Sequence, residues 1–69
     1  MKLEYFPDTD TLYIQLKKGP GADVEKVAPN VVLDYNYARE VIGVEIEQAS
    51  KMTDLTHSQL KVLSLNGGN

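Results

Sequence analysis

Apolar and polar residues alternate along the first part of the chain with the two-residue period of a half-buried strand. The alternation covers residues 2–6 and resumes over residues 11–16. Between these runs, residues 7–10 read Pro-Asp-Thr-Asp, and all four residue types favour turns. We therefore predict a β-hairpin with Tyr5 opposite Leu12, because this register places the apolar residues of both strands on one face.

The same alternation returns in the second half of the chain. It predicts one long strand over about 24–35 and another over 41–47, again joined by a short loop. The register that aligns the apolar residues of this second hairpin places Tyr35 opposite Ile42. In that register Val41 lies on the other face of the sheet.

The carboxy-terminal segment changes to a helical period. Its apolar residues between 52 and 63 fall within an arc of roughly 160° at 100° per residue. This predicts an amphipathic helix over about 54–64, with Thr53 or Asp54 as the N-cap. The expected fold is α+β: a single domain over residues 1–69, with a four-stranded antiparallel meander of two hairpins and the helix packed on one face.

The two faces of the predicted sheet are unequal. The first face is apolar and consists of Leu3, Tyr5, Leu12, Ile14, Leu16, Val31, Leu33, Tyr35, Ile42, Val44 and Ile46. We expect the helix to cover it. The second face mixes charged residues with a candidate interface made of Phe6, Tyr13, Val32, Val41 and Gly43. A face exposed only to water is usually more uniformly polar, so this mixture predicts an interaction surface. Gly43 inside a strand also predicts a bulge or the close approach of a ring.

Length and composition exclude several classes of protein. A chain of 69 residues buries only about 60% of its unfolded surface, so it is stabilised weakly by its core alone. It contains no cysteine and one histidine, which excludes disulfides and a His/Cys zinc site. Oligomerisation is the remaining common means of stabilising so small a domain, and a homodimer is expected.

The charge distribution argues against nucleic-acid and membrane partners. Ten Asp and Glu residues against seven Lys and Arg give a formal net charge of −3, and no basic run is present. The longest apolar run is the three residues 31–33, far short of a membrane span. Residues 1–8 lack the apolar segment of a secretory signal, so a cytoplasmic location is expected.

Asp8 and Asp10 are the most conspicuous candidates for chemistry. A phosphoryl-transfer nucleophile in Asp-x-Asp-x-Thr needs a parallel, doubly wound sheet, and no βαβ unit fits in this length. A calcium ion needs six to eight oxygen ligands, more than this pair supplies. Turn formation is the simplest interpretation, and we expect no metal, no cofactor and no catalytic residue. The alternative is a small metal-dependent or hydrolytic enzyme that uses these aspartates or the pair Glu45 and Glu47.

Two further groups of polar residues favour a structural interpretation. Asp34, Glu45 and Glu47 can gather with Glu4 on the second face, but solvated strand charges explain them more simply. His57 is expected on the solvent side of the helix, since the sequence shows no pattern of a neighbouring Ser or Cys nucleophile.

Three segments carry a resemblance to a known family: YFPDTDTLYIQL at 5–16, EKVAPNVVLDY at 25–35 and VIGVEI at 41–46. Together they resemble the small prokaryotic proteins catalogued as domain of unknown function 2283, over about residues 2–50. The resemblance implies a compact β-rich unit with no established enzymatic activity. It also implies a protein-partner role of an antitoxin-like kind, because some relatives are encoded beside toxin-like proteins. Those relatives usually carry glycine where this chain has Arg39, so we expect a different turn here.

The predicted function is a non-enzymatic interaction module. It would self-associate or bind another protein through the second face or through an exposed edge of the sheet.

Overall fold

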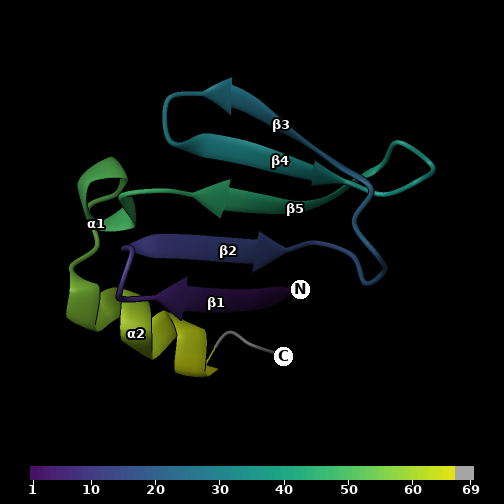
Figure 1. The fold of residues 1–69 in the computed structure, drawn as a ribbon. Coiled ribbons are helices and arrows are strands. Elements are labelled where there is room, and N and C mark those ends of the chain that lie inside the picture. The colour runs from purple at the N-terminus through teal and green to yellow at the C-terminus, as the bar shows by residue number, and fades with distance from the viewer. Residues whose placement is uncertain (67–69) are drawn as a thin grey trace.

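The chain forms a five-stranded antiparallel sheet with two helices, in a computed structural model that describes residues 1–66 (Figure 1). In chain order the elements are β1 (Lys2–Phe6), β2 (Thr11–Gln15), β3 (Asp23–Ala28), β4 (Val31–Tyr35), β5 (Val41–Ile46), α1 (Ala49–Met52) and α2 (His57–Asn66). The strands are arranged in the order β1-β2-β5-β4-β3, and every neighbouring pair is antiparallel. The α+β class expected from the sequence is therefore confirmed.

The first hairpin has the predicted register. Tyr5 lies opposite Leu12, and the strands β1 and β2 are joined by the turn at residues 7–10. The N–H group of Asp10 donates to the Pro7 carbonyl over 3.3 Å. Asp10 has a φ of 55°, a left-handed conformation that aspartate adopts more readily than most residues. Turn chemistry and side-chain parity were thus sufficient to predict this hairpin.

The long strand predicted over 24–35 is wrong, because the chain reverses inside it. Pro29 and Asn30 form a tight turn between β3 and β4, which pair with each other. Pro29 has no N–H to donate to a ladder, and Asn30 takes the left-handed φ of 66°. The predicted meander is also wrong, since β5 lies between β2 and β4.

The pairing of β4 with β5 contains a β-bulge next to Gly43. Leu33 lies opposite Val44 as predicted, but Tyr35 lies opposite Val41 and not opposite Ile42. Ile42 is the extra residue of the bulge and is only 3% exposed. The predicted irregularity at Gly43 is confirmed. Val41, however, is paired with Tyr35 of the first face, so the observed register does not place Val41 on the second face as predicted.

The turn between β4 and β5 differs from the expectation based on Arg39. Arg39 does adopt a positive φ, of 65°, so the expected change of turn is wrong. Asn36 holds the turn: its carbonyl accepts the Arg39 N–H over 3.0 Å, and its side-chain oxygen accepts two more backbone N–H groups. The guanidinium also lies 4.9 Å from the centre of the Tyr35 ring and 3.3 Å from a carboxylate oxygen of Asp23.

The helical segment begins later than predicted. Thr56 is the residue before α2, and its hydroxyl accepts the Gln59 N–H over 3.2 Å while the Gln59 side chain accepts the Thr56 N–H over 2.9 Å. This reciprocal pair is a capping box, so the N-cap expected at Thr53 or Asp54 is wrong. The four-residue helix α1 was not predicted, because a single turn is too short to show a helical period. Neither helix of residues 1–66 is long and apolar enough to cross a membrane.

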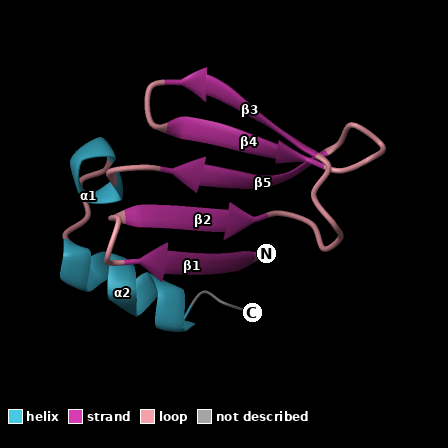
Figure 2. Ribbon diagram, viewed as in Figure 1, coloured by secondary structure: helices cyan, strands magenta, loops and turns pink. Residues whose placement is uncertain are grey.

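Helix α2 packs on β1 at one edge of the sheet, and β3 forms the opposite edge (Figures 1 and 2). Leu60 of α2 is fully buried and packs in one cluster with Tyr5, Leu12 and Ala49. The Ser64 hydroxyl accepts the Tyr5 N–H over 3.1 Å. Because that N–H points away from β2, the helix satisfies a backbone group on the outer edge of β1 and shields this edge.

The helix does not cover the whole first face. Val31, Leu33 and Val44 are only half-buried, and Leu16 is 45% exposed. The expectation that one helix covers the first face is therefore wrong for β4 and for Val44 of β5, whereas Ile46 of β5 packs against the core cluster. The reason is geometric, since a helix about 10 Å wide spans the width of only two strands.

Candidate functional site

The second face is organised around Tyr13, which lies across Gly43. A β-carbon on Gly43 would come within 2.7 Å of the Tyr13 Cζ atom, so the ring occupies the space that any other residue would need. The Tyr13 hydroxyl donates to Asp34 over 3.0 Å. The predicted approach of a ring to Gly43 is confirmed. Burial and the bond to Asp34 raise the pKa of the Tyr13 hydroxyl.

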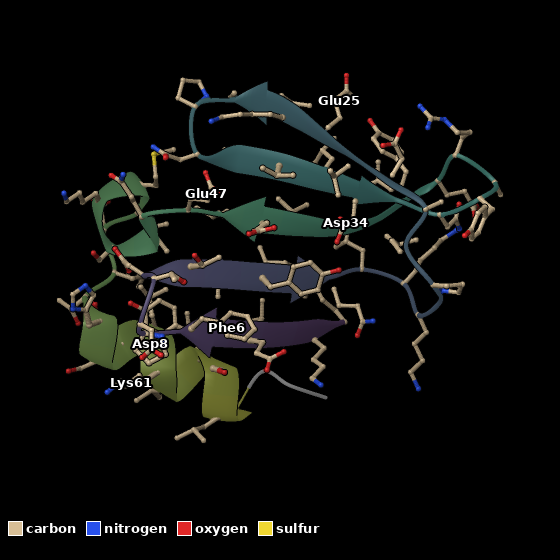
Figure 3. All side chains as sticks on the ribbon, in the orientation of Figure 1. Phe6, Asp8, Glu25, Asp34, Glu47 and Lys61 are labelled. Carbon is tan, nitrogen blue, oxygen red and sulfur yellow. The ribbon has the colours of Figure 1, made fainter. Side chains whose placement is uncertain are left out.

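The other members of the candidate interface are only partly brought together. Phe6 is 45% exposed and, with Tyr13 and Glu45, lines a shallow groove on the second face. Val32 is half-buried and lies opposite Glu45 in the ladder, beyond the groove. Val41 precedes the bulge residue Ile42 and is paired with Tyr35. Figure 3 shows Phe6 on β1, and the other candidate residues lie on β2, β4 and β5, so the set extends across most of the sheet.

Asp10 connects the first hairpin to α1. Its carboxylate accepts the Tyr5 hydroxyl over 2.6 Å, the Ser50 hydroxyl over 2.6 Å and the Ser50 N–H over 3.1 Å. Its backbone carbonyl accepts the Ala49 N–H over 2.7 Å. The bonds from Ser50 first, and then the bond from Tyr5, lower the pKa of this carboxyl. The turn predicted at Asp8 and Asp10 is confirmed, and Asp10 additionally organises the tertiary contact.

His57 lies beside this cluster. Its Nε2 atom is 3.0 Å from the Ser50 hydroxyl and 3.7 Å from the Asp10 carboxylate, and its ring stacks near Tyr5 at 6.5 Å. The side chain is 66% exposed, which agrees with the predicted surface position. The sequence showed no pattern of a serine nucleophile, but the fold brings Ser50 within hydrogen-bond distance of His57. Forty residues separate Asp10 from Ser50, so local sequence could not reveal this cluster.

The geometry of Asp10, Ser50 and His57 differs from that of a catalytic triad. In a triad the carboxylate binds the imidazole nitrogen that faces away from the serine, and the imidazole takes the serine proton. Here a single nitrogen, Nε2, faces both partners, and the Ser50 hydroxyl donates to the carboxylate itself. The arrangement holds α1 against the hairpin turn.

Three tyrosines of the sheet each donate to a carboxylate: Tyr5 to Asp10, Tyr13 to Asp34 and Tyr35 to Glu25. Burial, together with the bond to Asp10, raises the pKa of Tyr5 to about 12. The bond to Glu25, followed by burial, raises the pKa of Tyr35. Each of these three carboxylates therefore accepts a hydrogen bond from a tyrosine of the sheet, although the bond to Glu25 lies at the exposed edge.

The remaining candidate carboxylates lie apart. Asp8 is exposed in the hairpin turn, whereas Glu45 and Glu47 are half-buried. Within residues 1–66 no three His, Asp or Glu side chains come close enough together to hold a metal ion.

Part of the first face is only half-buried, although Ile14 and Ile46 within it pack against the core cluster. Ladder pairing aligns Ile14, Val44 and Leu33 in one row across β2, β5 and β4. Ile46 and Val31 form the adjacent row. All five of these side chains are only half-buried, and charge first appears in the Ile14 row at Glu25 of β3. This area, the bare half of the first face, was assigned to the core by sequence reasoning.

Comparison with known proteins gives one match. The family model described as "Protein of unknown function (DUF2283)" matches residues 2–50. No curated protein and no solved structure matches the chain. The matched region ends within α1, so α2 lies beyond it.

Proposed function

This chain belongs to the DUF2283 family, whose description assigns no function, and we propose that it is a non-enzymatic module that self-associates through the bare half of the first face. The supporting observation is the row of Ile14, Val44 and Leu33, three half-buried apolar residues with no charge among them. Burying such a row stabilises an assembly by about 25 cal/mol for each Å² removed from water.

The edges of the sheet are less suited to association. Ser64 satisfies the outward Tyr5 N–H at the edge of β1, and α2 packs alongside. The other edge, β3, is fully exposed but carries a bulge after Lys26 and two further charged residues, Asp23 and Glu25. Bulges and edge charges are the usual means by which proteins prevent strand addition.

The second face is the less favourable surface for self-association. It presents Glu4, Glu45 and Asp34, and Tyr13 is already bonded to Asp34. Two copies meeting there would bring like charges together. The groove beside Phe6 therefore remains the alternative contact surface, for a partner of different sequence.

Two neighbouring residues of β4 provide a matched test, because they point to opposite faces. Leu33→Lys places a charge on the first face opposite Glu25, which can pair with it in the monomer. Val32→Glu places a charge on the second face between Lys26 of β3, which can pair with it, and Glu45 of β5, which repels it. Circular dichroism and thermal melts verify that both variants are folded.

Sedimentation velocity then compares the two variants with the parent chain. We expect a dimeric parent, a dimeric Val32→Glu and a monomeric Leu33→Lys. Loss of the dimer in Val32→Glu alone would transfer the interface to the second face and overturn this assignment. A monomeric parent would remove the support for self-association altogether.

The rival function is a small hydrolytic or metal-dependent enzyme, and the contact among Asp10, Ser50 and His57 is the observation in its favour. An ion that binds the native state must raise the melting midpoint. Melts with calcium, magnesium and manganese therefore test it. We expect no increase, and a rise that Asp10→Asn abolishes but Asp8→Asn retains would favour the enzyme.

A further inference from the structure

We propose that the groove beside Phe6 on the second face binds an arginine side chain of a partner protein. The groove has a volume of about 350 Å³ and is lined by Phe6, Thr9, Thr11, Tyr13 and Glu45. That volume is near the lower end of the range for ligand pockets, so the groove admits one long side chain and not a helix or a strand. The proposal is independent of self-association, which uses the opposite face of the sheet.

The groove is open because the Tyr13 ring leans away from Phe6. The ring covers Gly43, which is the ladder partner of Gln15, two residues after Tyr13. Phe6 is instead the partner of Thr11, two residues before Tyr13. Thr11 is buried, so it forms the floor of the space that lies between the two rings.

The hydroxyl groups of the groove use their own protons inside the fold. The Thr9 hydroxyl donates to the Thr11 hydroxyl over 2.9 Å, and the Thr11 hydroxyl donates to the Thr9 carbonyl over 3.4 Å. The Tyr13 hydroxyl donates to Asp34. The polar atoms that these described side chains still offer to a ligand are acceptors, namely the exposed Thr9 hydroxyl oxygen and the Glu45 carboxylate. A ligand that suits the groove must therefore supply hydrogen-bond donors.

The charge around the groove requires that the donor is a cation. Glu45 is half-buried, and its ladder partners on β2 and β4 are uncharged. Glu4 flanks Tyr13 from the other side, on β1. Lys2 lies two residues before Glu4, away from the groove, and Lys26 lies two strands beyond Glu45. No ion pair among residues 1–66 neutralises either glutamate, so the groove is negative and complements a positive side chain.

The aromatic walls favour arginine over lysine. Phe6 is 45% exposed on one side of the groove, and Tyr13 lies on the other. A guanidinium group is planar, stacks on aromatic rings and binds a carboxylate such as Glu45 through two parallel hydrogen bonds. An ammonium group is compact and strongly hydrated. Because the groove is shallow, its occupant needs further contacts with the surrounding sheet, which a protein supplies and a free small cation does not.

Short peptides test this recognition directly. The isotope-labelled full chain is titrated with acetyl-Gly-Arg-Gly-amide and, as a neutral control of the same shape, with acetyl-Gly-citrulline-Gly-amide. Amide chemical shifts are followed by NMR. We expect the arginine peptide to shift the signals of Phe6, Tyr13 and Glu45. The citrulline peptide should bind about fivefold more weakly or worse, because it lacks both the ion pair and the cation–π contact.

Four variants assign the contacts. Glu45→Gln removes the carboxylate and Phe6→Ala removes the exposed ring, and each should weaken the arginine peptide by about two- to fivefold. The matched controls should retain the parent affinity. Glu25→Gln removes the same charge from the other face, and Tyr37→Ala removes an 80% exposed ring in the turn between β4 and β5. Circular dichroism verifies that all four are folded.

Equal binding of the two peptides, shifts confined to residues outside the groove, or no shift at all would overturn the proposal. An equal loss of affinity in Glu45→Gln and Glu25→Gln would also overturn it, because the effect would then depend only on net charge. None of these results depends on whether the parent chain is a monomer or a dimer, so self-association is tested separately.

Discussion

Gly43→Ala tests whether the Tyr13 ring really requires a glycine beneath it. The substitution adds one methyl group on the second face, at a position whose φ alanine can adopt. That methyl would lie 2.7 Å from the Tyr13 Cζ atom and 2.9 Å from Cε1, well inside van der Waals contact. Tyr13 must therefore rotate away, and the hydrogen bond of 3.0 Å to Asp34 is lost.

The two consequences of the substitution have opposite signs. Displacement of the ring costs about 1–3 kcal/mol, as overpacking usually does, and the lost hydrogen bond adds about 1 kcal/mol. Alanine in a strand is intrinsically better than glycine by roughly 0.5–1 kcal/mol, which offsets part of this loss. The expected net destabilisation is about 1–3 kcal/mol. For a domain of this size each kcal/mol lowers the melting midpoint by about 4–8 °C.

A double-mutant cycle isolates the effect of the ring. In the Tyr13→Ala background the methyl group meets no ring, so Gly43→Ala should become stabilising by roughly 0.5–1 kcal/mol. The assay is urea unfolding of the four proteins at one fixed chain concentration, since a dimer's stability depends on concentration. If Gly43→Ala destabilises both backgrounds equally, the ring is not the reason for the glycine.

Three other substitutions test separate parts of the fold. Leu60→Ala leaves a cavity at a fully buried site and should lower the free energy of unfolding by about 2–5 kcal/mol, measured with denaturant. Helix α2 lies outside the family match, and a change under about 0.5 kcal/mol would show that the helix is dispensable for stability. The pKa of Asp10 is lowered in the folded state, so the ionised carboxylate stabilises the fold above pH about 4, and this stabilisation is lost as the pH falls through the folded pKa. In a plot of melting midpoint against pH, Asp10→Asn should therefore reduce the fall at acid pH. Asp8→Asn is the control and should leave that part of the plot unchanged. Arg39 has a φ of 65°, so Arg39→Gly should be more stable than Arg39→Ala by about 1 kcal/mol in urea titrations, and equal stability would contradict strain at this turn.

Short-range information was sufficient for the first hairpin and insufficient for the second. Residues 7–10 are turn formers flanked by two alternating runs, so the register of β1 and β2 followed directly. At Pro29 and Asn30 the alternation continues on both sides of a two-residue turn, so periodicity alone suggested one strand. The order of strands depends on β2 pairing with β5, a contact between residues more than 25 positions apart that no local pattern encodes.

The same distinction applies to the sites. Gly43 in a strand predicted both the nearby bulge and the overlying ring, because each has a local cause in the missing side chain. Ser50 was not recognised, because its contacts with Asp10 and His57 exist only after the helices pack against the hairpin turn. The bare half of the first face was missed because the width of a helix relative to a five-stranded sheet becomes relevant only when the strand count is known.

The mass of the chain in solution tests the central claim most directly. Sedimentation equilibrium of the parent protein and of Leu33→Lys, at matched concentrations, measures it without reference to shape. We predict about 15 kDa for the parent, twice the 7.7 kDa of one chain, and 7.7 kDa for the variant. A parent of 7.7 kDa at every concentration, or a variant that remains at twice that mass, would contradict association through the first face.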